Sequence, residues 1–270
     1  METDSALDGS DLPVIPPGED ELPSDDGEPM ETNDHRLQMV LLIQELKQAW
    51  AGREDYFVAG NMFVYFSEEQ VTYNDFRGPD FFLVLGTTGR SRKSWVAWRE
   101  NGKLPDLVIE LLSNRTRHVD RGEKMHIYSK VWRTPEYFLF DPVRFEFEGY
   151  RLDPANFEYR RIEPNASGDL FSQVTGFGLG LREGLFEDVR RRWLWFLDPN
   201  GHPLPTPQDV ADIERRRADD EKQRADDEKQ RADDEKRRAD DEKRRADDEE
   251  RRADELSERV RELEEKLRGG

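Results

Sequence analysis

The sequence contains no cysteine, and its 270 residues include only four histidines. Without cysteine there is no disulfide framework and no thiolate metal site. No histidine lies at ligand spacing from another, which argues against a zinc site. No apolar run approaches the roughly 18 residues that a membrane-spanning helix needs, and the N-terminus lacks the basic segment of a signal peptide. We therefore expect a soluble, cytoplasmic protein with no membrane partner.

Charge is distributed unevenly along the chain. Residues 1–34 hold twelve acidic residues and no Lys or Arg, and residues 208–270 are dominated by charged heptads. All six tryptophans lie within residues 50–200, and roughly 170 residues suffice for one well-buried domain. We predict an acidic disordered tail over 1–34, a globular domain over 35–207 and a charged heptad-repeat helix or coiled coil over 208–270. The tail either solvates the chain or forms an acidic strand that mimics nucleic acid and covers a basic cleft.

The C-terminal heptads place alanine at position a and glutamate at position d. These residues do not drive a tight coiled coil, so intrahelical pairs such as Asp220 with Arg224 are expected to hold the helix, at about 0.2–0.5 kcal/mol each. Only the last stretch continues the register with large apolar side chains, at Leu256, Val260, Leu263 and Leu267. We predict a homodimer or the docking of another partner through these four residues. The alternative is a solvated rod without a partner.

Strand and helix patterns alternate through the middle of the chain. An amphipathic helix from Arg36, a hairpin around Gly60-Asn61 and an apolar strand in 79–85 come first. A crossover helix with a capping box is predicted to begin at Asp120, and further strands follow it. This order predicts an α/β fold, with a mixed β-sheet flanked by helices and a long charged C-terminal helix.

The stretch Leu104–Lys124 carries the main chemical signal, because its apolar strand contains Asp106 and Glu110. A carboxylate in such a strand is costly unless it is paired or binds a metal. The two acids share one face, but four residues at about 3.3 Å each separate them by roughly 13 Å, so they cannot hold one ion. Asp80, at the head of the preceding apolar strand, can lie beside Glu110 if the two strands are neighbours. Such a pair with a backbone carbonyl would suit Mg²⁺, or Mn²⁺, and Asp106 would be structural.

Lys124 is the third member of the predicted site. It shares one helix face with Ile127, Tyr128 and Val131, at i, i+3, i+4 and i+7, and should therefore face the sheet. An ammonium group in that position either reaches back to solvent or points at the carboxylates. Together, the metal and Lys124 would stabilise the charge that develops when a phosphodiester bond is hydrolysed.

Five short motifs lie within residues 50–207. They are Pro79-Asp80, VIELLS at 108–113, SNRTR at 113–117, DRGEK at 120–124 and PEYFLFD at 135–141. Together they resemble the Uma-two family of restriction endonucleases, in the PD-(D/E)XK nuclease superfamily. The resemblance implies a restriction-endonuclease-like fold and metal-dependent cleavage of DNA.

The same resemblance assigns roles to individual residues. Asp80 matches the aspartate of the PD motif, and Glu110 matches the acid of the second motif. The superfamily lysine should stand at position 112, where this chain has Leu112; as in other members of the family, Lys124 would replace it in space. Many relatives carry a glutamate near the glycine of the first hairpin, where this chain has Asn61.

DNA contacts are predicted from two basic loops, because cationic side chains neutralise phosphates. The residues are Arg90, Arg92, Lys93, Arg115, Arg117 and Arg121. The alternative for them is an ordinary solvated surface. The sequence thus predicts a Mg²⁺-dependent DNA endonuclease that hydrolyses phosphodiester bonds. The rival prediction is a catalytically weakened nuclease-fold scaffold that acts through the C-terminal helix.

Overall fold

The computed structural model describes residues 16–22, 32–67 and 78–268. Most of the predicted disordered tail therefore lies outside the described residues. The chain divides into two compact units, Met1–Pro207 and Gln208–Gly270.

A six-stranded mixed sheet forms the centre of the first unit, in the order β1-β3-β5-β6-β7-β8. Strands β5 and β6 are parallel, and every other neighbouring pair is antiparallel. The strands are β1 (Tyr56–Ala59), β3 (Phe81–Leu85), β5 (Leu107–Leu111), β6 (Glu136–Asp141), β7 (Glu146–Asp153) and β8 (Glu158–Arg161). The prediction of a mixed sheet flanked by helices is confirmed.

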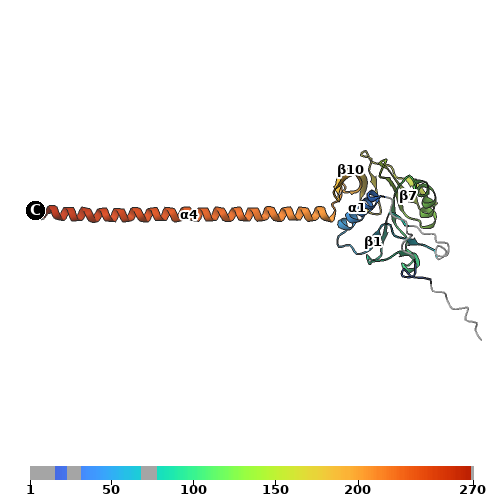
Figure 1. The fold of residues 1–270 in the computed structure, drawn as a ribbon, viewed down its shortest axis with the longest axis horizontal. Coiled ribbons are helices and arrows are strands. Elements are labelled where there is room, and N and C mark those ends of the chain that lie inside the picture. The colour runs from blue at the N-terminus through green and yellow to red at the C-terminus, as the bar shows by residue number, and fades with distance from the viewer. Residues whose placement is uncertain (1–15, 23–31, 68–77, 269–270) are drawn as a thin grey trace, which may run out of the picture. The chain divides into compact units, whose positions relative to one another are not determined.

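One face of this sheet packs against a helix and a second sheet (Figure 1). The helix is α1 (Asn33–Ala49), which the Thr32 side chain caps by accepting a hydrogen bond from the His35 N–H. The second sheet has the order β11-β10-β9, with β9 (Leu170–Phe171), β10 (Gly178–Phe186) and β11 (Val189–Leu197). Gln38 joins α1 to β11. Its side chain donates a hydrogen bond to the carbonyl of Leu194 and accepts one from the N–H of Leu194.

Successive side chains of a strand point to opposite faces of the sheet. The odd-numbered side chains of β3 and β5 therefore face α1 and the second sheet, and the even-numbered ones lie on the opposite face. This opposite face packs against a helical segment made of α3 (Arg117–Val119) and two π-helical turns, η3 (Asp120–Lys124) and η4 (Ile127–Val131). It also packs against the small parallel pair β2 (Val64–Tyr65) and β4 (Trp95–Val96). The 3₁₀ turn η2 (Ala97–Arg99) follows β4.

Two local predictions are wrong. Strands β1 and β2 do not form a hairpin around Gly60-Asn61, because β1 pairs with β3 and β2 pairs with β4. The crossover helix begins at Arg117, after a turn in which the Ser113 hydroxyl accepts from two backbone N–H groups. Asp120 therefore lies inside the helix and is buried, which leaves its side chain free of any capping role.

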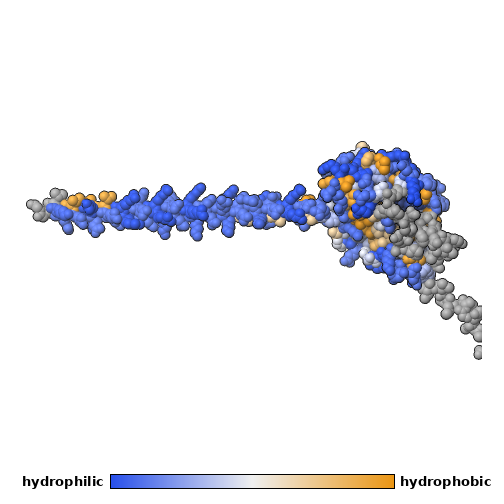
Figure 2. Space-filling view, in the orientation of Figure 1, coloured by the Kyte–Doolittle hydropathy of each residue, from blue (hydrophilic) through white to orange (hydrophobic). Residues whose placement is uncertain are grey.

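The second unit is one helix, α4 (Pro207–Arg268), whose 62 residues span about 93 Å. Figure 2 shows a hydrophilic surface along nearly all of α4, with apolar residues near its end. Leu256, Val260 and Leu263 are 66%, 52% and 54% exposed, and the side chain of Leu267 lies outside the described residues. None of the described helices is both long enough and apolar enough to cross a membrane.

Candidate active site

The register of two neighbouring strands brings Asp80 to Glu110. Strands β3 and β5 are antiparallel with Phe81 opposite Ile109, so the residue before β3 lies beside Glu110. The N–H of Leu111 donates to Asp80 Oδ2 at 2.8 Å, and the N–H of Asp80 lies 3.4 Å from Glu110 Oε2. Asp106, at the other end of β5, accepts a 2.7 Å hydrogen bond from the N–H of Leu85, which is a structural role.

The loop before β3 is held by the end of β1. The N–H of Asn61 donates to the carbonyl of Pro79 at 2.9 Å. A Cβ at Gly60 would come within 2.3 Å of the Asp80 carbonyl oxygen, so only glycine permits this approach. The position predicted for an auxiliary acid thus lies next to Asp80, although this chain has an amide there.

Lys124 reaches the same place from the crossover helix. Its ammonium group lies 3.0 Å from Glu110 Oε2 and 2.9 Å from Asp120 Oδ1, and its side chain is 17% exposed. The ammonium group of Lys124 therefore points at the carboxylates and does not reach back to solvent. Leu112, at the position of the superfamily lysine, is buried in the apolar core.

The π-helical turns align three side chains on the site. Residues four apart lie on one face of a helix, because one turn holds about four residues. Asp120, Lys124 and Tyr128 have this spacing, and the Tyr128 hydroxyl donates to Glu110 Oε1 at 2.7 Å. Both oxygens of Glu110 are therefore held by groups from one helix.

A further side chain comes from α1. His35 Nε2 lies 3.1 Å from the carbonyl oxygen of Leu111, which can only accept, so Nε2 carries the proton of this hydrogen bond. Its Nδ1 lies 3.0 Å from the Thr32 hydroxyl. The start of α1 is thus fixed to the end of β5, beside Asp80. Sequence reasoning missed His35, and it gave Asp120 and Tyr128 only cap and packing roles.

Burial and crowding of charge shift the pKa values here. Burial raises the pKa of Glu110 to about 8; Lys124 opposes this rise, and Asp80 and Asp120 add to it. Burial also raises the pKa of Asp80 against the opposing effects of Lys124 and the Leu111 N–H. Burial alone would lower the pKa of Lys124, but the three carboxylates outweigh it and raise that pKa. Three carboxyl groups thus share one ammonium group.

This donor set fits a divalent cation of the Mg²⁺ type. Mg²⁺ is commonly held by one or two carboxylates and keeps several waters. Asp80 and Glu110 supply two adjacent carboxylates whose mutual repulsion a cation would relieve. Over the residues that the structure describes, no three His, Asp or Glu side chains are arranged as a metal cluster. A cation at this site would therefore take the rest of its ligands from water or from a substrate.

Of the three residues predicted for the second basic loop, Arg115 precedes the crossover helix, whereas Arg117 lies in α3 and Arg121 lies in η3. Arg117 forms ion pairs with Asp141 and, at 3.8 Å, with Glu146. Arg121 lies 2.6 Å from Glu148, and Arg115 is exposed. Their role in DNA binding stays a prediction.

The first basic loop follows β3 and so lies at the opposite end of that strand from Asp80. Arg92 is buried: it lies 2.7 Å from Glu100, donates to the carbonyls of Thr88 and Arg90, and stacks on two aromatic rings. In this conformation its guanidinium group has no free face for DNA. Arg90 and Lys93 are exposed but paired, with Glu19 at 3.0 Å and with Asp20 at 2.6 Å respectively.

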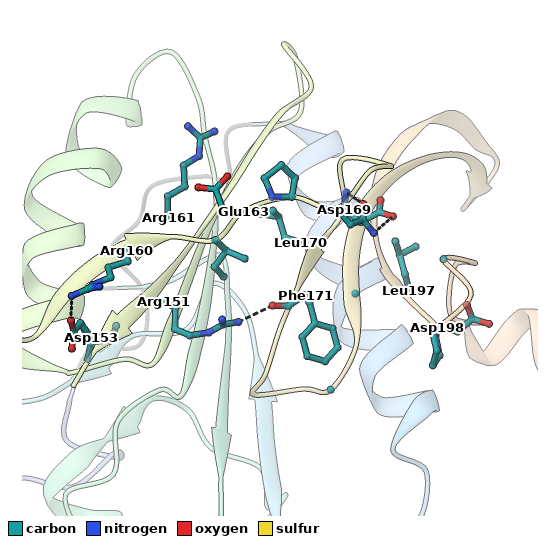
Figure 3. Close-up of a pocket in the computed structure, with 18 of the residues that line it drawn as sticks. Arg151, Asp153, Arg160, Arg161, Glu163, Asp169, Leu170, Phe171, Leu197 and Asp198 are labelled. Atoms are coloured by element: carbon teal, nitrogen blue, oxygen red, sulfur yellow. Dashed lines mark hydrogen bonds and ion pairs between the residues drawn. The ribbon is translucent and has the colours of Figure 1, made fainter. Parts of the chain in front are cut away.

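A pocket of about 710 Å³ lies elsewhere, between the β7–β8 edge and the second sheet (Figure 3). Several of its charged groups are already engaged: Arg160 pairs with Asp153, Arg182 pairs with Asp169, and Arg151 donates to the carbonyl of Phe171. Neither Asp80 nor Glu110 lines it. We therefore place the candidate chemistry at the carboxylate–lysine site.

The chain was compared with curated proteins, solved structures and family models. A comparison with curated proteins found no match. Among solved structures, one similar chain is described as "a putative nuclease belonging to DUF820 from Anabaena variabilis ATCC 29413". It shares 14% identity and a TM-score of 0.41, over 58% of this chain and 87% of that one. The model of the Uma2 family, described as "Putative restriction endonuclease", matches residues 20–187. Because that match spans more than half of the sequence, the chain belongs to the Uma2 family.

Proposed function

We propose that this protein is a Mg²⁺-dependent endonuclease that hydrolyses phosphodiester bonds of DNA. One observation carries the proposal: Asp80, just before β3, lies beside Glu110 of β5, and the Lys124 ammonium group lies 3.0 Å from Glu110. Membership of the Uma2 family supports the reaction class.

Each side chain has a defined part in this proposal. A bound divalent cation would supply positive charge at the phosphate and acidify water at neutral pH. Asp80 and Glu110 would hold that cation, while Lys124 would place its charge where a phosphate oxygen becomes more negative. Asp120 fixes Lys124, and Tyr128 fixes Glu110, so both positions are set before DNA arrives.

Nicking of supercoiled plasmid tests the proposal. We expect the wild-type chain to convert supercoiled to relaxed DNA with Mg²⁺ and to lose this activity in EDTA. Asp80→Asn should lower the rate at least about hundredfold, because it removes a ligand charge at the reacting centre. Asp106→Asn is the matched control, since Asp106 bonds a backbone N–H at the far end of the same strand pair. Equal nicking by wild type and Asp80→Asn would overturn the assignment.

The variant Lys124→Met tests whether the charge of this side chain, and not its length, is needed for nicking. Methionine keeps an unbranched chain of similar length but removes the ammonium group that Glu110 and Asp120 share. We expect the nicking rate to fall about a hundredfold or more while Mg²⁺ still binds, because the lost group stabilises developing charge. If Lys124→Met nicks as fast as wild type, the lysine is not part of the catalytic machinery.

A specific observation favours the rival function, a nuclease-fold scaffold. Lys124 and Tyr128 already contact both oxygens of Glu110, so this carboxylate has hydrogen-bond partners without a cation. Isothermal titration with Mg²⁺ separates the two functions. An endonuclease should bind Mg²⁺ in a way that Asp80→Asn abolishes, whereas a scaffold should show no such binding.

A further inference from the structure

Residues 16–22 of the acidic N-terminal region form an ordered turn on the surface of the first unit. The N–H of Glu21 donates to the carbonyl of Gly18 at 3.1 Å, and the Glu21 carboxylate accepts from the N–H of Gly18 at 2.8 Å. This β-turn has Glu19 and Asp20 at its two central positions. Their carboxylates therefore project from one small, rigid corner of the chain.

The turn lies against the first basic loop and the 3₁₀ turn that follows it. Glu19 accepts from Arg90 at 3.0 Å and from the N–H of Lys93 at 3.1 Å, and Asp20 accepts from the Lys93 ammonium group at 2.6 Å. Two backbone carbonyls extend the contact. Trp98 Nε1 donates to Pro17 at 3.0 Å, and Arg99 donates to Pro16 at 2.5 Å.

All five of these hydrogen bonds run in one direction, from the domain surface to the segment. The surface of Arg90, Lys93, Trp98 and Arg99 presents donors, three of them on cationic side chains, and the segment presents acceptors. Phosphodiester oxygens are likewise acceptors with negative charge, so the segment supplies the same chemistry as a nucleic-acid backbone.

An apolar anchor holds the end of the segment on the domain. Leu22 is buried with Phe63, Tyr65 and Val96. The Phe63 ring lies close to Gly78, where an added Cβ would meet it at 3.3 Å, and Gly78 is two residues from Asp80. The segment thus contacts the first basic loop through its turn, and it contacts Phe63, which lies close to Gly78, through Leu22.

We propose that the surface of Arg90, Lys93, Trp98 and Arg99 binds the DNA backbone, and that the segment 16–22 occupies it as a competitor. The inference rests on the proposed endonuclease function. DNA must displace Glu19 and Asp20 to reach the surface, while the Leu22 anchor keeps the segment close enough to rebind. The acidic segment then weakens DNA binding by competing for the same donors.

Fluorescence anisotropy with a labelled DNA duplex tests this competition, using the full-length chain at low salt in EDTA so that no cleavage occurs. Glu19→Gln removes one charge from the contact and should lower the Kd for DNA about two- to fivefold, which is the range for losing exposed ion pairs. Glu21→Gln is the matched control. It removes the same charge from the same turn, but Glu21 bonds only within the segment in the contacts described above.

The combined variant Arg90→Ala/Lys93→Ala completes the test. We expect it to raise the Kd for DNA several-fold and to erase the difference between Glu19→Gln and wild type. If Glu19→Gln and Glu21→Gln bind DNA equally well while wild type nicks plasmid with Mg²⁺, the competition is overturned and the endonuclease proposal stands. If no variant binds DNA, the proposed function fails, and this inference fails with it.

Discussion

At the scale of the residue, Glu110 decides what the candidate site can do. It lies near the C-terminal end of β5, on the face that packs against the crossover helix, and it is fully buried with a partner at each oxygen. Burial raises its pKa to about 8, so a proton competes with a cation for this carboxyl group near neutral pH. A cation can bind Glu110 only in its ionised form, so binding must release that proton.

Mg²⁺ affinity should therefore depend on pH. Below the Glu110 pKa of about 8 the cation displaces a proton, so the affinity should rise with pH and level off above that value. For one displaced proton the slope is about tenfold per pH unit. Isothermal titration in buffers of different ionisation enthalpy measures both the affinity and the proton release. An affinity that is constant between about pH 6 and about pH 8 would contradict the role of Glu110 as a ligand.

Sequence reasoning could reach some of these residues and not others. Asp80, Glu110 and Lys124 follow from strand and helix periods, which are local, together with one assumption about neighbouring strands. His35 could not be found this way, because its contact with Leu111 joins residues 76 positions apart. Tyr128 looked like a packing residue, because its spacing places it on the sheet-facing side of the helix but does not show that its hydroxyl donates to Glu110, 18 positions earlier.

At the scale of the element, apolar runs predicted β3, β5 and β6 well, because strands buried on both faces are recognisable without knowing their partners. The prediction of a hairpin around Gly60-Asn61 was wrong because it depended on which strand pairs with β1. Those turn residues are a local signal, but the partner of β1 is β3, which begins about twenty residues later. Pairing between distant strands is what a single sequence does not show.

Glu136 connects the six-stranded sheet to the segment that follows β9 in the second sheet. The carboxylate is buried at the start of β6 and accepts from Ser172 Oγ at 2.5 Å, from the N–H of Gln173 at 2.8 Å and from Arg151 at 3.0 Å. Glu136→Ala would leave these donors without their acceptor, and Arg151 is itself partly exposed. We expect a loss of about 2–4 kcal/mol in the free energy of unfolding.

Urea denaturation measures this loss. Glu158→Ala is the control, because that side chain is 65% exposed and lies 3.9 Å from Lys130, so its removal should change stability by less than about 0.5 kcal/mol. Equal midpoints for the two variants would show that Glu136 does not hold the sheets together.

At the scale of the whole molecule, the chain joins a compact domain to a long charged helix. Along most of α4, alanine and glutamate occupy the a and d positions, whereas Leu256, Val260 and Leu263 near its end are large and exposed. A β-branched residue at a with leucine at d suits a parallel two-stranded coil. With so few apolar positions, any association through this end should be weak and concentration-dependent.

Sedimentation equilibrium tests that association. We expect the mean mass of the wild-type chain to rise with concentration, and Leu263→Asp to remain monomeric because it places a charge at a d position. Leu185→Asp is the control, since it makes the same change at a leucine of β10 that is 56% exposed. A wild-type mass that stays monomeric at all concentrations would leave α4 as a solvated helix.

The central claim is that Asp80 and Glu110 together hold one divalent cation beside Lys124. Anomalous scattering from crystals grown with Mn²⁺, which takes the same oxygen ligands as Mg²⁺, measures this directly. We predict a peak within about 2.0–2.4 Å of one carboxylate oxygen from each residue, lost in Asp80→Asn and kept in Asp106→Asn. A peak bound to neither carboxylate, or none at a saturating Mn²⁺ concentration, would contradict the account.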